Sequence, residues 1–249
     1  GVLMNKVIRC KNTNNKKIVV LLISQVVCGV MPVLLLAAFV LLKLYETKIT
    51  AVVAIGLIFL CNVGYMLLAR RYNVLNSGRR GERDLYKTVR HLGGNNIIFC
   101  NLPVRYKRGR SELDMLIISH KGLIIVEVKN HSGTIQGSWK ADKWEQRKYY
   151  RGGKNTSQEM DNPIKQMRRQ RDIVKSILNA AGEDVWIDTV LYFSSSNAKL
   201  KLNLRESDYV CLGSKELLHF LECYDRNVVV SRVQMEKYAR ILNEARANI

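Results

Sequence analysis

Acidic residues are scarce in this chain of 249 residues, which has 21 Asp and Glu against 40 Lys and Arg. The imbalance is greatest in residues 1–80, where eleven basic residues accompany a single acid, Glu46. A net charge of +19 indicates a polyanionic partner, either nucleic acid or an acidic lipid surface. The six cysteines are scattered and lack metal-like spacing, which argues against a zinc module and fits the reduced thiols of a cytoplasmic protein. Internal repeats, heptads and low-complexity tracts are absent as well, so the sequence is neither a repeat protein nor a coiled coil.

Long apolar runs, in contrast, are present twice, over residues 18–42 and 49–69. Each exceeds the roughly 18–20 residues that a helix needs to cross a bilayer. A cleaved signal peptide has an apolar core of only about 7–15 residues, which excludes that interpretation of the first run. Buried core helices are the alternative, but two adjacent runs of this length favour a transmembrane helical hairpin.

Basic residues at the ends of the runs predict the orientation. Lys16 and Lys17 precede the first run and Arg70 and Arg71 follow the second, whereas the loop between the runs carries few charges. The positive-inside tendency therefore places both termini and the soluble domain in the cytoplasm, with the chain as a multi-pass protein of the inner (cytoplasmic) membrane. The expected organisation is a basic cytoplasmic segment (1–17), a transmembrane hairpin (18–69), a linker (70–80) and a soluble domain (81–249).

Short apolar runs and helical patterns alternate in the soluble part, which indicates an α/β domain. A helix is expected from near Gly81, then a strand over 95–102 and a basic loop from Pro103. The later expected elements are strands over 115–119, 123–126, 133–139 and 144–150, a polar loop to Asn162, a helix over 163–181, strands over 185–193 and 209–212, and helices over 215–223 and 233–245.

Charged residues stand at one end of the hairpin that these strands form around His120-Lys121-Gly122. If the pairing is centred on this turn, Asp114 lies opposite Glu127, and Lys129 shares the strand face of Glu127. Burying such charges is costly unless they are paired or bind a metal. The hairpin alone leaves two alternatives open, a structural salt-bridge cluster and a divalent-metal site.

The ordered motifs resemble the nuclease-related domain family, a branch of the PD-(D/E)XK restriction-endonuclease-like superfamily. They are Gly81-Glu82, Glu112-Leu-Asp114, Glu127-Val-Lys129-Asn130 with Gly133, Trp144, and Asn162-Pro163-Ile-Lys-Gln166. The resemblance implies a mixed sheet flanked by helices, here preceded by the two-helix transmembrane hairpin.

The resemblance also implies roles for five residues. Asp114 and Glu127 would be metal ligands, Lys129 the catalytic lysine, Glu82 an accessory acid and Gln166 a helper on the following helix. The hard oxygen ligands favour Mg²⁺ or Mn²⁺ over zinc. Two of these residues also have a non-catalytic interpretation. Glu82 could be only a partner of the helix dipole, and Gln166 could be an ordinary surface residue.

Basic residues near these motifs would contact a phosphate backbone without reading its sequence. They are Arg105, Lys107 and Arg108 before the hairpin, and Lys165, Arg168 and Arg169 on the helix of Gln166; a solvated surface is the alternative for each. The expected function is a membrane-anchored, Mg²⁺-dependent nuclease acting on DNA, or on RNA, at the cytoplasmic face. The alternative is a catalytically inactive membrane protein that uses the nuclease-like fold to bind nucleic acid or partners in an envelope complex.

Overall fold

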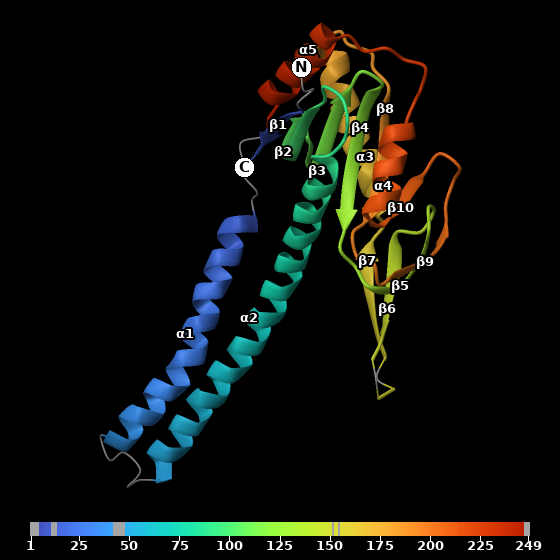
Figure 1. Cartoon of the computed structure of the whole chain (residues 1–249). Coiled ribbons are helices and arrows are strands. Elements are labelled where there is room, and N and C mark those ends of the chain that lie inside the picture. Colours follow the sequence, from blue (N-terminus) through green and yellow to red (C-terminus); the bar gives the residue numbers. More distant parts are fainter. Residues whose placement is uncertain (1–4, 11–13, 42–47, 151, 154, 247–249) are drawn as a thin grey trace. The chain divides into compact units, whose positions relative to one another are not determined.

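The chain divides into two compact units (Figure 1). The computed structural model describes residues 5–10, 14–41, 48–150, 152–153 and 155–246. Unit 2 comprises residues 12–79, and unit 1 comprises residues 1–11 together with 80–249.

Unit 2 consists of helix α1 (Asn14–Leu41) and the first part of helix α2 (Lys48–Val89). Both helices are long and apolar enough to cross a membrane, with mean hydropathies of 2.6 and 2.3 over their most apolar windows. A Cβ atom added at Gly29 would lie 3.7 Å from the ring of Tyr65, and one added at Gly64 would lie 3.7 Å from the sulfur of Cys28, so the two helices approach each other at small residues. The predicted end of the first span at Leu42, the loop that follows it to Thr47, and residues 1–4 and 11–13 of the basic segment lie outside the described residues.

The linker that we predicted over residues 70–80 is helical, because α2 continues through it to Val89. Extending an existing helix adds one hydrogen bond for each residue that is ordered, whereas starting a helix is unfavourable. The segment has no proline and only one interior glycine, Gly78, so nothing in it stops the helix. The helix that we expected to begin near Gly81 is therefore the last part of α2.

The main sheet of unit 1 has six strands in the order β1-β2-β3-β4-β8-β10. They are β1 (Lys6–Arg9), β2 (Ile97–Tyr106), β3 (Gly109–Ser119), β4 (Gly122–Lys129), β8 (Ile187–Phe193) and β10 (Tyr209–Leu212). The sheet is mixed: β2, β3 and β4 are antiparallel, and the pairs β1–β2, β4–β8 and β8–β10 are parallel. Residues 6–9 of the basic N-terminal segment thus form an edge strand of this sheet, which the sequence did not predict.

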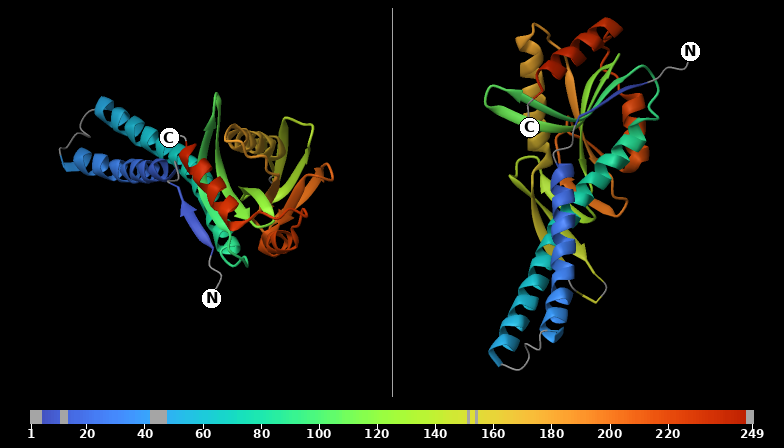
Figure 2. Two further views of the ribbon diagram at one scale, coloured as in Figure 1. Left: turned by 90° about the horizontal axis from the view of Figure 1, so that it is seen from above. Right: turned by 90° about the vertical axis from the view of Figure 1, so that its left-hand side faces the viewer.

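Helices cover both faces of the main sheet (Figure 2). Ile97 and Phe99 of β2 face a core shared with α3 (Pro163–Ala180) and α5 (Arg232–Glu244). Ile98, which points to the opposite face, packs in a core with α4 (Gly213–Cys223) and with Leu85 at the end of α2. The predicted fold class, a mixed sheet flanked by helices and preceded by two apolar helices, is confirmed.

A second sheet of four strands has the order β7-β6-β5-β9. Its strands are β5 (Gly133–Ser138), β6 (Lys143–Tyr149), β7 (Asn155–Asp161) and β9 (Ala198–Asn203). The prediction of a polar loop up to Asn162 was wrong, since β7 pairs with β6 along its whole length. The basic loop expected from Pro103 was wrong as well: β2 and β3 continue as a hairpin in which Arg105 pairs with Arg110.

Candidate active site

Asp114 and Glu127 lie on adjacent strands at the end of the β3–β4 ladder. Ser119 pairs with Gly122, and the ladder runs back to the pair Met115–Val126. One further step in this register places Asp114 opposite Glu127, as the turn residues predicted. The Asp114 carboxylate extends the ladder, because its Oδ2 accepts a hydrogen bond of 2.8 Å from the Val128 N–H.

Glu127 is the centre of a buried network of charge-assisted hydrogen bonds. Its side chain is 2% exposed, and its Oε1 accepts from Lys129 Nζ at 2.6 Å and from Gln166 Nε2 at 2.7 Å. Its Oε2 accepts from Gln170 Nε2 at 2.8 Å. Lys129 Nζ also donates to Gln166 Oε1 at 3.1 Å, so Gln166 contacts both charged groups. Such hydrogen bonds are the stronger kind and fix the orientation of the carboxylate.

Burial and neighbouring charges shift the pKa values of Asp114 and Lys129. Burial raises the pKa of Asp114 well above its ordinary value of 3.8, and the charge of Glu127 raises it further. Lys129 and the Val128 N–H offset only part of this shift. Burial alone would lower the pKa of Lys129, but the charges of Glu127 and Asp114 outweigh it and raise that pKa above 10.5. Lys129 is therefore an ammonium ion at neutral pH, beside two acids that repel each other.

Glu82 approaches the site from α2 and is held there by Asn101. Asn101 Nδ2 donates to Glu82 Oε2 at 2.9 Å, and the charge of Glu82 contributes to the raised pKa of Asp114. Asn101 has a positive φ of 54°, and the β2–β3 register places it opposite Asp114. Such a backbone conformation is uncommon outside glycine and is enriched at functional sites. Glu82 lies in the interior of α2, which removes the alternative that it is only a partner of a helix N-terminus.

Gly81 allows α2 to pack closely against this end of the sheet. A Cβ atom at Gly81 would lie 3.1 Å from the Cβ of Asn130 and 3.3 Å from Val128 Cγ2. Because real Cβ contacts are seldom that short, a larger residue would push α2, and Glu82 with it, away from β4. The motif Gly81-Glu82 therefore combines close packing with an acid.

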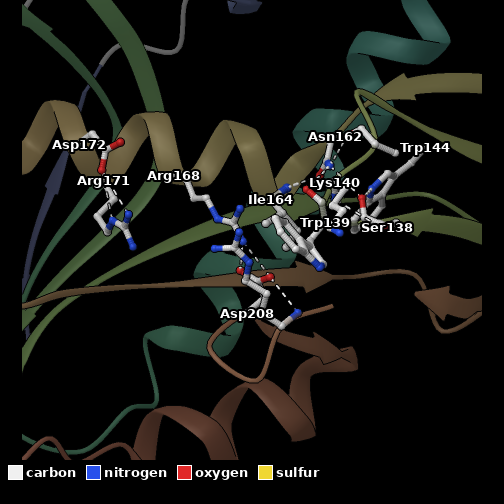
Figure 3. A network of polar contacts seen from close by, with 12 residues as sticks. Ser138, Trp139, Lys140, Trp144, Asn162, Ile164, Arg168, Arg171, Asp172 and Asp208 are labelled. Atoms are coloured by element: carbon white, nitrogen blue, oxygen red, sulfur yellow. Dashed lines mark hydrogen bonds and ion pairs between the residues drawn. The ribbon is translucent and has the colours of Figure 1, made fainter. Parts of the chain in front are cut away.

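Asn162, which Figure 3 shows beside Ser138 and Ile164, caps the start of α3, and Pro163 is its first residue. Together they fix the position of Gln166 on this helix. Asn162 Oδ1 accepts from the Ile164 N–H, while its Nδ2 donates to the carbonyls of Ser138 and Ala141. Trp144 Nε1 donates to the same Ser138 carbonyl, which joins the β5–β6 turn to the helix cap. Pro at the first position of the helix lacks only an N–H that would have no helical partner. The second sheet thus serves as a support for α3.

Most of the basic residues that we predicted to contact nucleic acid line one pocket of about 500 Å³, between the tip of the β2–β3 hairpin and α3. Lys107, Arg108, Lys165, Arg168 and Arg169 belong to it, and Arg105 lies outside. Arg168 is engaged elsewhere, since its Nη2 donates to both carboxylate oxygens of Asp208, at 2.8 and 2.9 Å (Figure 3). Lys165 pairs with Asp142. Within the described part of the chain, Arg108 has no side-chain hydrogen bond or ion pair, which leaves its guanidinium available for a ligand.

Sequence reasoning missed Gln170 and Asn101. Gln170 is fully buried and donates both to Glu127 and to the Glu112 carbonyl, at 2.8 and 3.1 Å. Its position one helical turn after Gln166 was a signal that could have identified it, because residues i and i+4 share a helix face. Asn101 gave no such signal.

A carboxylate pair and a lysine thus meet on one hairpin of a mixed sheet that is flanked by helices. Residues 77–194 match the family described as Nuclease-related domain, so this part of the chain is similar to that family. The matched range contains Glu82, Asp114, Glu127, Lys129 and Gln166. No curated protein and no solved structure matches the chain.

Proposed function

We propose that the chain is a membrane-anchored, divalent-metal-dependent nuclease that hydrolyses phosphodiester bonds of DNA or RNA at the cytoplasmic face of the inner membrane. The observation that carries the proposal is the arrangement of Asp114, Glu127 and Lys129. An ammonium ion and two carboxylates meet at the end of a hairpin, and Gln166 and Gln170 hold one of the carboxylates from α3.

A hydrated Mg²⁺ or Mn²⁺ ion suits this donor set. Among the described residues, no three Asp, Glu, His or Cys side chains come together as a metal-binding group. Mg²⁺ is commonly bound by only one or two protein carboxylates and keeps several waters. Burial, and after it the repulsion from Glu127, raises the pKa of Asp114, and a bound divalent cation would offset this by stabilising the charged carboxylate. Asp114 and Glu127 would hold the ion, since each carboxylate oxygen can accept more than one interaction. When bound, the ion supplies Lewis-acid stabilisation of the phosphate charge and lowers the pKa of a water.

The chain's own residues would position the attacking water and the phosphate backbone and stabilise the charge that develops on the phosphate. Lys129 keeps its charge, so its ammonium orients the attacking water or pairs with the charge that develops on the phosphate. Gln166 bonds to both Lys129 and Glu127 and fixes the distance between them. Arg108, with Lys107 and Arg169 in the neighbouring pocket, would hold the phosphate backbone without reading bases.

Unit 2 supports the proposed membrane anchoring. In the most apolar windows of α1 and α2 hardly any residue is buried within the protein, unlike the core helices of a soluble protein. The pairing of β1 with β2 adds an argument about topology, because it joins residues before α1 to the same folded sheet as residues after α2. Both segments must then lie on one side of the membrane, as two spans require, and the basic flanks favour the cytoplasmic side.

A second candidate function is a catalytically inactive protein that binds nucleic acid or partners. It is favoured by the full engagement of Glu127, whose two oxygens already accept three hydrogen bonds within the protein. In that case the charged cluster stabilises the fold and has no metal.

Cleavage assays on the detergent-solubilised full chain separate the two functions. Supercoiled plasmid, single-stranded DNA and RNA are incubated with Mg²⁺, Mn²⁺ or EDTA, and Mn²⁺ binding is measured in parallel. We expect metal-dependent cleavage, with Lys129→Ala reducing turnover more than Mn²⁺ binding and Asp114→Ala reducing both. Metal-independent binding without cleavage of any of the three substrates would establish the second function instead.

A further inference from the structure

A pocket between α1 and α2 combines four cations with an apolar lining, and we call it the interhelical pocket. It has a volume of about 700 Å³ and lies within unit 2. Its lining comprises Lys16, Lys17, Val20 and Leu21 of α1, and Arg70, Arg71, Val74 and Leu75 of α2.

The described residues of unit 2, 14–41 and 48–79, contain no acid that could pair with the four cationic side chains. Among the described residues, none of the four makes a side-chain hydrogen bond or ion pair. The only acid in the sequence of residues 1–80 is Glu46, which lies outside the described residues. Four positive charges that share one pocket repel one another, and an anion placed between them relieves that repulsion.

Apolar side chains form the rest of the pocket; its two valines are exposed and its two leucines are partly buried. Val20 and Val74 are 61% and 68% exposed. Each follows a cation by one helical turn, Lys16 and Arg70 respectively, so a cation and an apolar residue share a face on both helices. A nucleic-acid backbone would satisfy the cations but leave the valines and leucines in water. A ligand that satisfies both needs an anionic head and an apolar body.

We propose that the interhelical pocket binds an anionic phospholipid, with the phosphate between the lysines and the arginines and the acyl chains along the valines and leucines. The proposal rests on the membrane anchoring proposed above, which puts these cations at headgroup depth, directly outside the two apolar runs. Basic pockets between membrane helices on the cytoplasmic side bind acidic headgroups in this way. A zwitterionic lipid brings its own cation and gains less from four positive charges.

Native mass spectrometry of the full chain, released from nanodiscs of equal parts phosphatidylglycerol and phosphatidylcholine, tests the proposal. The wild type is expected to retain phosphatidylglycerol about tenfold over phosphatidylcholine. The quadruple variant Lys16→Gln, Lys17→Gln, Arg70→Gln, Arg71→Gln should lose this preference. A charge-conserving variant that exchanges each lysine for arginine and each arginine for lysine should keep it.

A second control removes the same number of charges from exposed positions of unit 1 and should behave as the wild type. It carries Lys175→Gln, Lys199→Gln, Lys201→Gln and Lys215→Gln. Retention of phosphatidylglycerol by the first quadruple variant, or equal retention of both lipids by the wild type, would overturn the pocket assignment while the anchoring stands. A chain that does not enter the nanodiscs at all would overturn the anchoring and the pocket together. If the first quadruple variant instead loses affinity for a DNA duplex and keeps its lipid preference, the pocket is a nucleic-acid contact and the lipid assignment is wrong.

Discussion

Replacing Asp114 by Asn should stabilise the protein, although it removes a residue that we place in the active site. Burial and the charge of Glu127 raise the pKa of Asp114, which means that the fold disfavours the charged carboxylate. Asn keeps an oxygen to accept the Val128 N–H, and the Glu127–Lys129 ion pair remains. We expect a gain of about 1 kcal/mol in the free energy of unfolding at neutral pH, or about 2–4 °C in Tm for a domain of this size.

The pH dependence of this gain tests the reasoning behind it. An acid whose pKa is raised by folding stabilises the fold below its ordinary pKa of 3.8, and that stability is lost as the pH rises through the raised value. The difference in Tm between Asp114→Asn and the wild type should therefore grow as the pH rises and disappear in acid. Differential scanning fluorimetry of the full chain across pH measures it. A lower Tm for Asp114→Asn, or a difference that is constant with pH, would refute the account of Asp114.

Glu127→Gln should act in the opposite direction. The carboxylate is 2% exposed and accepts three hydrogen bonds, so removing its charge leaves Lys129 without its ion-pair partner. The expected cost is about 3–5 kcal/mol, which should lower the Tm by about 10 °C in the same scans. An unchanged Tm would contradict this expectation. Gln170→Met keeps the side-chain volume but removes the hydrogen-bond donor to Glu127 Oε2. Cleavage should slow about 10–100-fold while DNA binding, measured in a filter assay, stays unchanged. A normal cleavage rate would show that Gln170 has no positioning role. Deleting residues 1–10 removes β1 and exposes the edge of β2. The truncated protein should unfold at a lower temperature than the wild type and should aggregate more readily, as measured by light scattering. Equal unfolding temperatures and equal aggregation of the two proteins would show that β1 contributes nothing to the stability of the domain. Arg108→Gln should weaken DNA binding and lower the slope of log Kd against log salt by about one, whereas a steeper or equal slope would place the phosphate contact elsewhere.

Local signals in the sequence were enough for the hairpin that carries the site. The turn at His120-Lys121-Gly122 fixes the register, and the structure pairs Ser119 with Gly122 as that turn requires. The start of α3 was equally readable, because Asn162 and Pro163 are a helix cap and a first helical residue. In both cases the information lies within a few neighbouring residues.

The missed elements have no such local signal. Strand β7 consists almost wholly of polar, exposed residues, so it lacks the apolar alternation that marks a strand and forms only because β6 lies beside it. Strand β1 has four residues within a basic segment, and its partner β2 is about ninety positions away in the sequence. Gln170 differs from these strands, because its spacing of four from Gln166 is a local signal, but only the packing of α3 on β4 shows that its amide faces Glu127.

The most direct test of the central claim, that Asp114, Glu127 and Lys129 form a catalytic centre, is single-turnover cleavage of DNA that is already bound to the full chain. DNA is bound in EDTA, Mg²⁺ is then added in excess, and the cleaved fraction is followed for the wild type and for Lys129→Ala at matched occupancy. We expect the wild type to cut and Lys129→Ala to cut about 10²–10³-fold more slowly, since its ammonium acts on the reacting phosphate and not on binding. DNA that stays intact on the wild type, or equal rates for the two proteins, would contradict the claim.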